Sequence, residues 1–158
     1  MEVTPQFMER RAVAHATVLL TRYSGLIVAE ARGDSAYDLE VAIPYQGQIS
    51  GRVFGVELKA RVTLDRVGRF TREGTFRLQP PLRDALRSHG MRVRELPFPV
   101  LYMVFAMETD RTFFGWLREP LVTPRPRLVS MPVEFAVEWQ ASSHKEVVGQ
   151  VQRWYDVR

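Results

Sequence analysis

The chain has 158 residues, of which 46% are hydrophobic and 25% are charged, and it contains no cysteine. This is the composition of one globular domain, and it excludes disulfides, iron–sulfur clusters, thiolate zinc sites and cysteine nucleophiles. No apolar run approaches the roughly 20 residues of a membrane-spanning helix, and the N-terminus lacks the pattern of a secretory signal. We therefore expect a cytoplasmic protein with no membrane partner.

Helix and strand signals follow one another along the chain. In chain order they predict a helix over 6–23, strands over 26–31, 38–45 and 53–62, a loop or short hairpin over 65–77, a helix over 80–88, strands over 100–107 and 112–117, a proline-rich loop over 120–132, an edge strand over 132–138 and a helix over 142–155. This order predicts one α/β domain over 1–158, with a mixed sheet of about five strands flanked by helices. Its core covers about 7–120, and a C-terminal strand and helix cover about 132–156.

Positive charge is unevenly distributed. The formal net charge is +4, whereas the segment 61–94 alone carries nine arginines against three acidic residues. A basic surface of this kind permits binding to a polyanion such as nucleic acid, although a general preference for arginine gives the same composition. Of the 22 basic residues only Lys59 and Lys145 are lysines, so Lys59 stands out among arginines.

The second and third predicted strands form the simplest hairpin and carry ionisable residues on one face. If the hairpin turns at 47–48, Asp38 lies opposite Glu57, and a turn at 50–51 shifts the register but keeps the same faces. Directly opposed side chains have Cβ atoms about 4.5–5.5 Å apart, so two carboxylates there must share a proton or a cation. Lys59 shares this face. Oxygen ligands of this kind suit Mg²⁺ or Mn²⁺; the alternative is a solvated sheet face with ordinary alternating charge.

Glu9 lies one turn before Val13 on the apolar stripe of the predicted first helix. A carboxylate on a core-facing stripe is costly unless it is paired or binds a metal. The alternative is that Glu9 lies in a frayed first turn and only favours the helix N-terminus.

An Asp that opens one strand, a Glu-x-Lys on the next strand and a preceding helix that carries Glu resemble the PD-(D/E)XK nuclease superfamily, which has the restriction-endonuclease-like fold. The residues that carry this resemblance are Asp38, Glu57-Leu58-Lys59 and Glu9. More narrowly, the segments 33–41, 51–59, 96–101 and 113–117 are similar to a bacterial domain of unknown function, family 4365, within that superfamily. The similarity covers about 7–120. Tyr37 departs from the Pro or Gly that usually precedes the Asp, and Glu57 stands where many relatives have Gln.

This resemblance implies a metal-dependent nuclease that hydrolyses phosphodiester bonds of DNA, with RNA as the alternative substrate. Asp38, Glu57 and the backbone carbonyl of Leu58 would hold Mg²⁺ or Mn²⁺, Lys59 would orient the attacking water, and Glu9 would support the site. The residues expected to contact the nucleic-acid backbone are Arg61, Arg66, Arg69 and Arg72. A homodimer is compatible with this role, because cutting both strands of a duplex needs two sites.

Two other classes of protein fit the same residues. One is a nuclease-fold DNA-binding or assembly subunit without turnover, which the short chain suggests because it leaves no room for a separate recognition domain. The other is a protein-interaction domain whose basic composition has no bearing on nucleic acid. Metal-dependent cutting, salt-sensitive binding without cutting, and absence of binding separate the three.

Overall fold

The computed structural model describes residues 4–22, 25–33 and 35–158. The helices within these residues are α1 Pro5–Leu20, α2 Leu64–Val67, α3 Pro80–Val93 and α4 Ser143–Val157. The strands are β1 Ile27–Glu30, β2 Leu39–Ala42, β3 Val53–Arg61, β4 Gly68–Phe70, β5 Phe76–Leu78, β6 Val100–Ala106, β7 Arg111–Leu121, β8 Arg127–Ser130 and β9 Phe135–Glu138. In the described part of the chain, no helix combines the length and the apolar character needed to cross a membrane.

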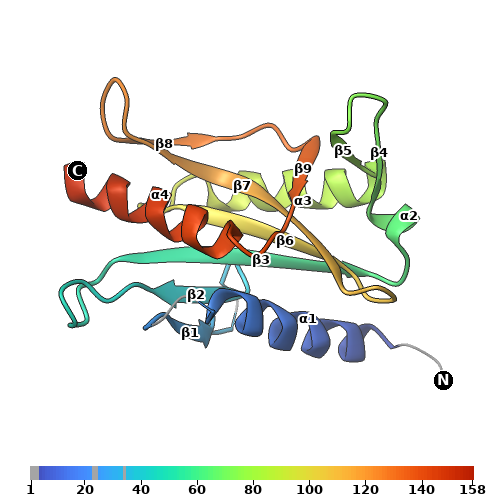
Figure 1. Cartoon of the computed structure of the whole chain (residues 1–158), viewed down its shortest axis with the longest axis horizontal. Coiled ribbons are helices and arrows are strands. Elements are labelled where there is room, and N and C mark those ends of the chain that lie inside the picture. The colour runs from blue at the N-terminus through green and yellow to red at the C-terminus, as the bar shows by residue number, and fades with distance from the viewer. Residues whose placement is uncertain (1–3, 23–24, 34) are drawn as a thin grey trace.

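The fold is a mixed α/β domain built on one large sheet (Figure 1). The strand order is β1-β2-β3-β6-β7-β9-β5-β4, and β8 pairs with the far end of β7. Among the described strands only β3 and β6 run parallel, and the other pairs are antiparallel. The parallel pair needs a crossover, which α2, the β4–β5 hairpin and α3 provide.

The prediction of about five strands is wrong, because the described residues form nine. The additional strands are short and lie in arginine- and proline-rich segments that lack a clear alternation of apolar residues. The segment 65–77 contains the β4–β5 hairpin, and the proline-rich loop contains β8. The strand predicted over 132–138 is present as β9, but its predicted edge position is wrong, because β9 lies inside the sheet and pairs with both β5 and β7.

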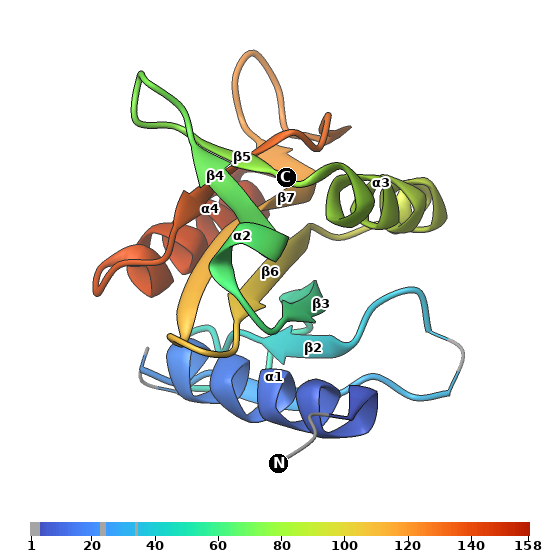
Figure 2. The ribbon, with the colours of Figure 1, turned by 90° about the vertical axis from the view of Figure 1, so that its right-hand side faces the viewer.

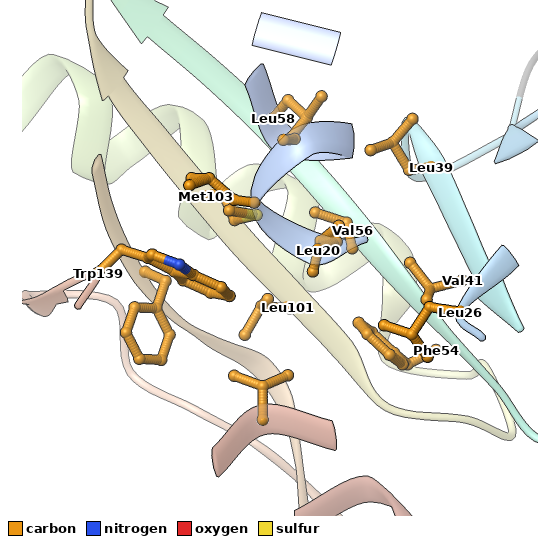
Figure 3. Close-up of a cluster of buried hydrophobic side chains, with 14 of the residues drawn as sticks. Leu20, Leu26, Leu39, Val41, Phe54, Val56, Leu58, Leu101, Met103 and Trp139 are labelled. Atoms are coloured by element: carbon orange, nitrogen blue, oxygen red, sulfur yellow. The ribbon is translucent and has the colours of Figure 1, made fainter. Parts of the chain in front are cut away.

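Helices cover both faces of the central strands. Viewed along the sheet, α4 and α3 lie on opposite sides of β6 and β7, and α1 packs beneath β2 and β3 (Figure 2). One apolar core lies between the sheet and α1 and α4, where the side chains of Leu20, Val56 and Leu58 gather (Figure 3). A second core joins α3 to the other face through residues such as Leu86 and Tyr102. Because both faces are covered, the side chain of Glu57 in the middle of β3 is removed from water.

The register of the β2–β3 hairpin agrees with the first predicted alternative, since Leu39 pairs with Val56 and Ala42 with Val53. The turn itself differs. Tyr45 and Gln48 bridge around a turn at 46–47, where Gln46 has φ 53° and Gly47 has φ 77°, as expected for a type I′ turn. Beyond this turn the two arms of the hairpin have unequal lengths. Residues 49–51 lie opposite Pro44 alone, and regular pairing resumes between Ile43 and Arg52. This bulge restores the register that places Asp38 opposite Glu57.

Two predicted helix ends differ from the structure. The first helix ends at Leu20 rather than at residue 23, which lies outside the described residues, as does Asp34 within the segment 33–41. The helix predicted to stop before Gly90 continues to Val93. A glycine within a helix costs only about 1 kcal/mol, and burial of Val93 in the second core outweighs it. His89 therefore belongs to a regular helix.

Candidate active site

The site lies where β3 continues beyond the end of β2. The pairing with β2 reaches Val56 only, so the second half of β3 has an open edge on that side. Asp38 precedes β2 and lies at this edge: its backbone N–H donates to the Val56 carbonyl, and its Oδ2 accepts a 2.7 Å bond from the Leu58 N–H. Since the N–H and C=O of one strand residue point to the same side, the Leu58 carbonyl faces the same opening.

A cleft of about 470 Å³ opens at this edge. Its lining residues come from α1, β3, α3 and the start of β2, and they are Pro5, Met8, Glu9, Ala12, Val13, Asp38, Glu57, Leu58, Lys59, Ala60, Arg61 and His89. Residues from four separate elements thus meet in one space. The predicted catalytic residues Asp38, Glu57 and Lys59 are among them, and so is Glu9.

Glu57 is the most deeply buried ionisable side chain of the cleft, with 3% of it exposed. Its carboxyl lies within hydrogen-bonding reach of the Asp38 carboxyl, and its Oε1 is 3.6 Å from Lys59 Nζ. Burial, followed by repulsion from Asp38, raises the pKa of Glu57 from 4.5 to about 8, and the attraction of Lys59 offsets only part of this. At pH 7 and without a cation, the Glu57 carboxyl is therefore mostly protonated.

His89 was not predicted as a site residue. Its Nε2 lies 3.2 Å from the same Oε1 of Glu57, so His89 and Lys59 approach one oxygen from α3 and β3. Burial, followed by the charge of Lys59, lowers the pKa of His89, which keeps the ring neutral at pH 7. Within the described residues its Nδ1 is buried without a hydrogen-bond partner. Sequence spacing cannot find this contact, because 32 positions and a crossover separate His89 from Glu57.

Tyr37, the departure from the usual Pro or Gly, packs where Asp38 is held. A Cβ added to Gly55 would lie 3.1 Å from Cγ and 3.2 Å from Cδ2 of the Tyr37 ring. The ring also meets Phe98 edge to face, with centroids 5.6 Å apart. Gly55 thus provides the space that Tyr37 fills, and the packed ring restricts the backbone immediately before Asp38.

Glu9 lines the cleft from the first turns of α1, and its side chain is exposed. The cost that a buried carboxylate would carry does not apply to it. Glu9 is the fifth residue of α1, and the first turn of this helix holds no acidic residue, so the alternative of a carboxylate in the first turn is wrong as well. What remains of the prediction is that Glu9 lines the same cleft as Asp38 and Glu57.

The four predicted nucleic-acid-binding arginines divide into two groups. Arg61 is half-buried, lines the cleft and donates to the Ala60 carbonyl, and Arg66 lines an adjoining groove that also contains Arg61. Arg69 lies on β4 directly opposite Arg77, and Arg72 lies in the loop of the β4–β5 hairpin. Of these four arginines, Arg61 alone lines the cleft that holds the carboxylates, and Arg66 adjoins it through the neighbouring groove.

The donor set fits a hard divalent cation. Two carboxylates and a backbone carbonyl converge at the open edge of β3, and Mg²⁺ typically takes one or two protein carboxylates together with waters and substrate phosphate oxygens. Within the described residues, no group of three or more His, Asp or Glu side chains is arranged to hold a metal ion. An ion here would therefore depend on Asp38, Glu57 and the Leu58 carbonyl, with substrate completing its shell.

No known protein family matches the chain, and no curated protein shows significant similarity to it. Function must therefore be argued from the residues of the cleft.

Proposed function

We propose that this protein is a cytoplasmic, Mg²⁺- or Mn²⁺-dependent nuclease domain of the PD-(D/E)XK type, with the restriction-endonuclease-like fold, that hydrolyses phosphodiester bonds of DNA. One observation carries the proposal: Asp38 and Glu57 hold their carboxyl groups together beside Lys59 in a cleft open to solvent. Burying two like charges costs stability, and a site that binds a cation gives a reason to keep them.

The roles of the residues follow from their positions. A bound divalent ion would polarise the phosphodiester and lower the pKa of a water molecule. Asp38 and Glu57 would supply carboxylate oxygens to that ion, and the bond from the Leu58 N–H fixes the orientation of Asp38. Lys59 presents a compact positive charge at the mouth of the pair, suited to a phosphate oxygen or to an attacking water. Arg61 and Arg66 would bind backbone phosphates beside the scissile bond.

The test is cleavage of plasmid and oligonucleotide DNA with Mg²⁺ or Mn²⁺, compared with EDTA. Asp38→Asn removes a carboxylate charge with little change of volume, Lys59→Ala removes the ammonium group and its stem from the partly exposed cleft mouth, and we expect each to reduce cutting at least ~100-fold. The chain offers matched controls, Asp84→Asn on the exposed side of α3 and Lys145→Ala, an exposed lysine in the first turn of α4. Equal cutting by Asp38→Asn and by Asp84→Asn would rule out the proposal.

A second candidate is a DNA-binding subunit that keeps the fold without turnover. The observation in its favour is the raised pKa of Glu57, because a protonated carboxyl does not bind a cation. This candidate predicts salt-sensitive DNA binding with no metal-dependent cutting at any pH up to 9.

A further inference from the structure

The two walls of the cleft differ in chemistry. The α1 wall is mostly apolar: it consists of Pro5, Met8, Ala12 and Val13, with Glu9 as its one ionisable side chain. The opposite wall holds the ionisable side chains of β3 and α3, with Glu57 at the bottom. A ligand that fills this cleft must therefore present an apolar surface on one side and an anionic or hydrogen-bonding group on the other.

Paired and unpaired DNA meet this requirement differently. A duplex presents sugars and phosphates on its outside and keeps the faces of its bases stacked in its interior. An unpaired nucleotide presents its phosphate together with a free base face, which packs on apolar and aromatic side chains. Because Glu57 is only 3% exposed, the reacting phosphate must also enter the cleft rather than pass over it.

Two grooves continue the cleft in different directions. One, of about 500 Å³, shares Met8 and Arg61 with the cleft and leads to Arg66. The other shares Glu9 and Val13 with the cleft and leads to Glu30. The first groove offers two guanidinium groups to phosphates, with Asp65 as its one acidic side chain. The second holds two carboxylates and one arginine, Arg10. Charge therefore directs a DNA strand along the first groove.

We propose that the substrate of this cleft is an unpaired DNA strand, such as a single strand or a frayed end. Its base packs against Met8 on the α1 wall, its phosphate lies at Lys59 beside the carboxyl pair, and its next phosphates follow Arg61 toward Arg66. The inference rests on the proposed function for the identity of the ligand, but it concerns binding and does not require turnover.

The experiment measures binding of the full chain by fluorescence anisotropy in EDTA, where no cutting occurs. The probes are a labelled single-stranded 20-mer and the blunt duplex of the same sequence. We expect the single strand to bind at least ~10-fold more tightly than the duplex, and Met8→Gln to weaken single-strand binding by ~3–10-fold. Met8→Leu keeps an apolar side chain and should bind as the wild type does. The matched control is Met91→Gln, because Met91 is 61% exposed on α3 and lines a different groove.

Each outcome decides the proposal. Equal or tighter binding of the duplex overturns it, and so does unchanged single-strand binding by a folded Met8→Gln protein. If Met8→Gln does not fold, the comparison of the two probes on the wild type decides alone. Metal-dependent cutting of a duplex without single-strand preference would overturn this inference while supporting the nuclease assignment. Single-strand preference without metal-dependent cutting would support this inference and contradict the nuclease assignment.

Discussion

Glu57 on β3 and Glu138 on β9 both face basic side chains, yet their surroundings move their pKa values in opposite directions. Arg111 binds Glu138 through two bonds of 2.8 Å, and these bonds lower the pKa of Glu138. Glu57 has Lys59 at 3.6 Å and a neutral His89, while burial and Asp38 raise its pKa to about 8. One carboxylate is fully compensated, and the other is not.

The difference separates two uses of charge. The Arg111–Glu138 pair is partly exposed and closed, so it joins β7 to β9 and leaves no oxygen in need of a ligand. The Glu57 cluster, which we define as Asp38, Glu57, Lys59 and His89, has less positive than negative charge when His89 is neutral and both carboxyls are ionised. A divalent cation would reverse that imbalance. An uncompensated buried carboxylate in a cleft is therefore a better sign of function than an ion pair of ideal geometry.

Replacing Glu57 tests this contrast most strongly. Glu57→Gln keeps the shape but loses the charge, and we expect cutting to fall more than ~100-fold. Stability should change in the opposite sense. Between pH 4.5 and about 8 the folded wild type holds a proton that the unfolded chain has released, so its stability falls as pH rises through this window. Glu57→Gln lacks this loss, and its Tm should exceed that of the wild type by ~5 °C at pH 8.5 but hardly at pH 5.

Thermal unfolding at both pH values, with and without Mg²⁺, provides the measurement. Mg²⁺ should raise the Tm of the wild type at pH 8.5, because the cation replaces the proton, and it should leave Glu57→Gln unchanged. A wild type whose Tm is independent of pH between 5 and 8.5 would contradict the assignment of Glu57 as an uncompensated carboxyl.

His89 should have a smaller effect, since it acts through Glu57. We expect its Nε2 to hold Oε1, which leaves the other oxygen of Glu57 toward Asp38. His89→Leu should weaken Mn²⁺ binding and cutting by roughly 10-fold, and His89→Gln, which keeps an N–H donor, should restore part of both. Titration calorimetry with Mn²⁺ and cleavage rates measure the two effects.

A matched control is His15→Leu. His15 is also a half-buried histidine near a carboxylate, with Nδ1 3.8 Å from Asp110, but it lies away from the cleft. If both histidine variants reduce Mn²⁺ affinity equally, His89 has no specific role in positioning Glu57.

Sequence reasoning placed Asp38, Glu57 and Lys59 on one face because strand alternation and a short hairpin fix both face and register. It could not place His89, whose position depends on how a helix 14 residues long packs within the crossover from β3 to β6. It also missed β8, where only four residues form a strand and pairing to β7 supplies the order that local preference lacks. The strand that forms β9 was predicted, but its place inside the sheet was not. Local periodicity thus predicted the carboxylate pair, and tertiary packing determined its surroundings.

Breaking the compensated pair should have the smallest effect, on stability alone. Arg111→Ala removes both bonds to Glu138 and the contacts of the guanidinium with the rings of Phe70 and Phe113. Because the pair is partly exposed, we expect a loss of about 1 kcal/mol, or ~2–4 °C in Tm. The loss should be present at pH 7 and shrink as pH falls below 4.5, where Glu138 is protonated in the unfolded chain and begins to be protonated in the folded protein. Cutting and Mn²⁺ affinity should match the wild type. A fall in either one that exceeds the loss of folded protein would show that the two clusters are coupled, and the division of charge into structural and functional sets would then fail.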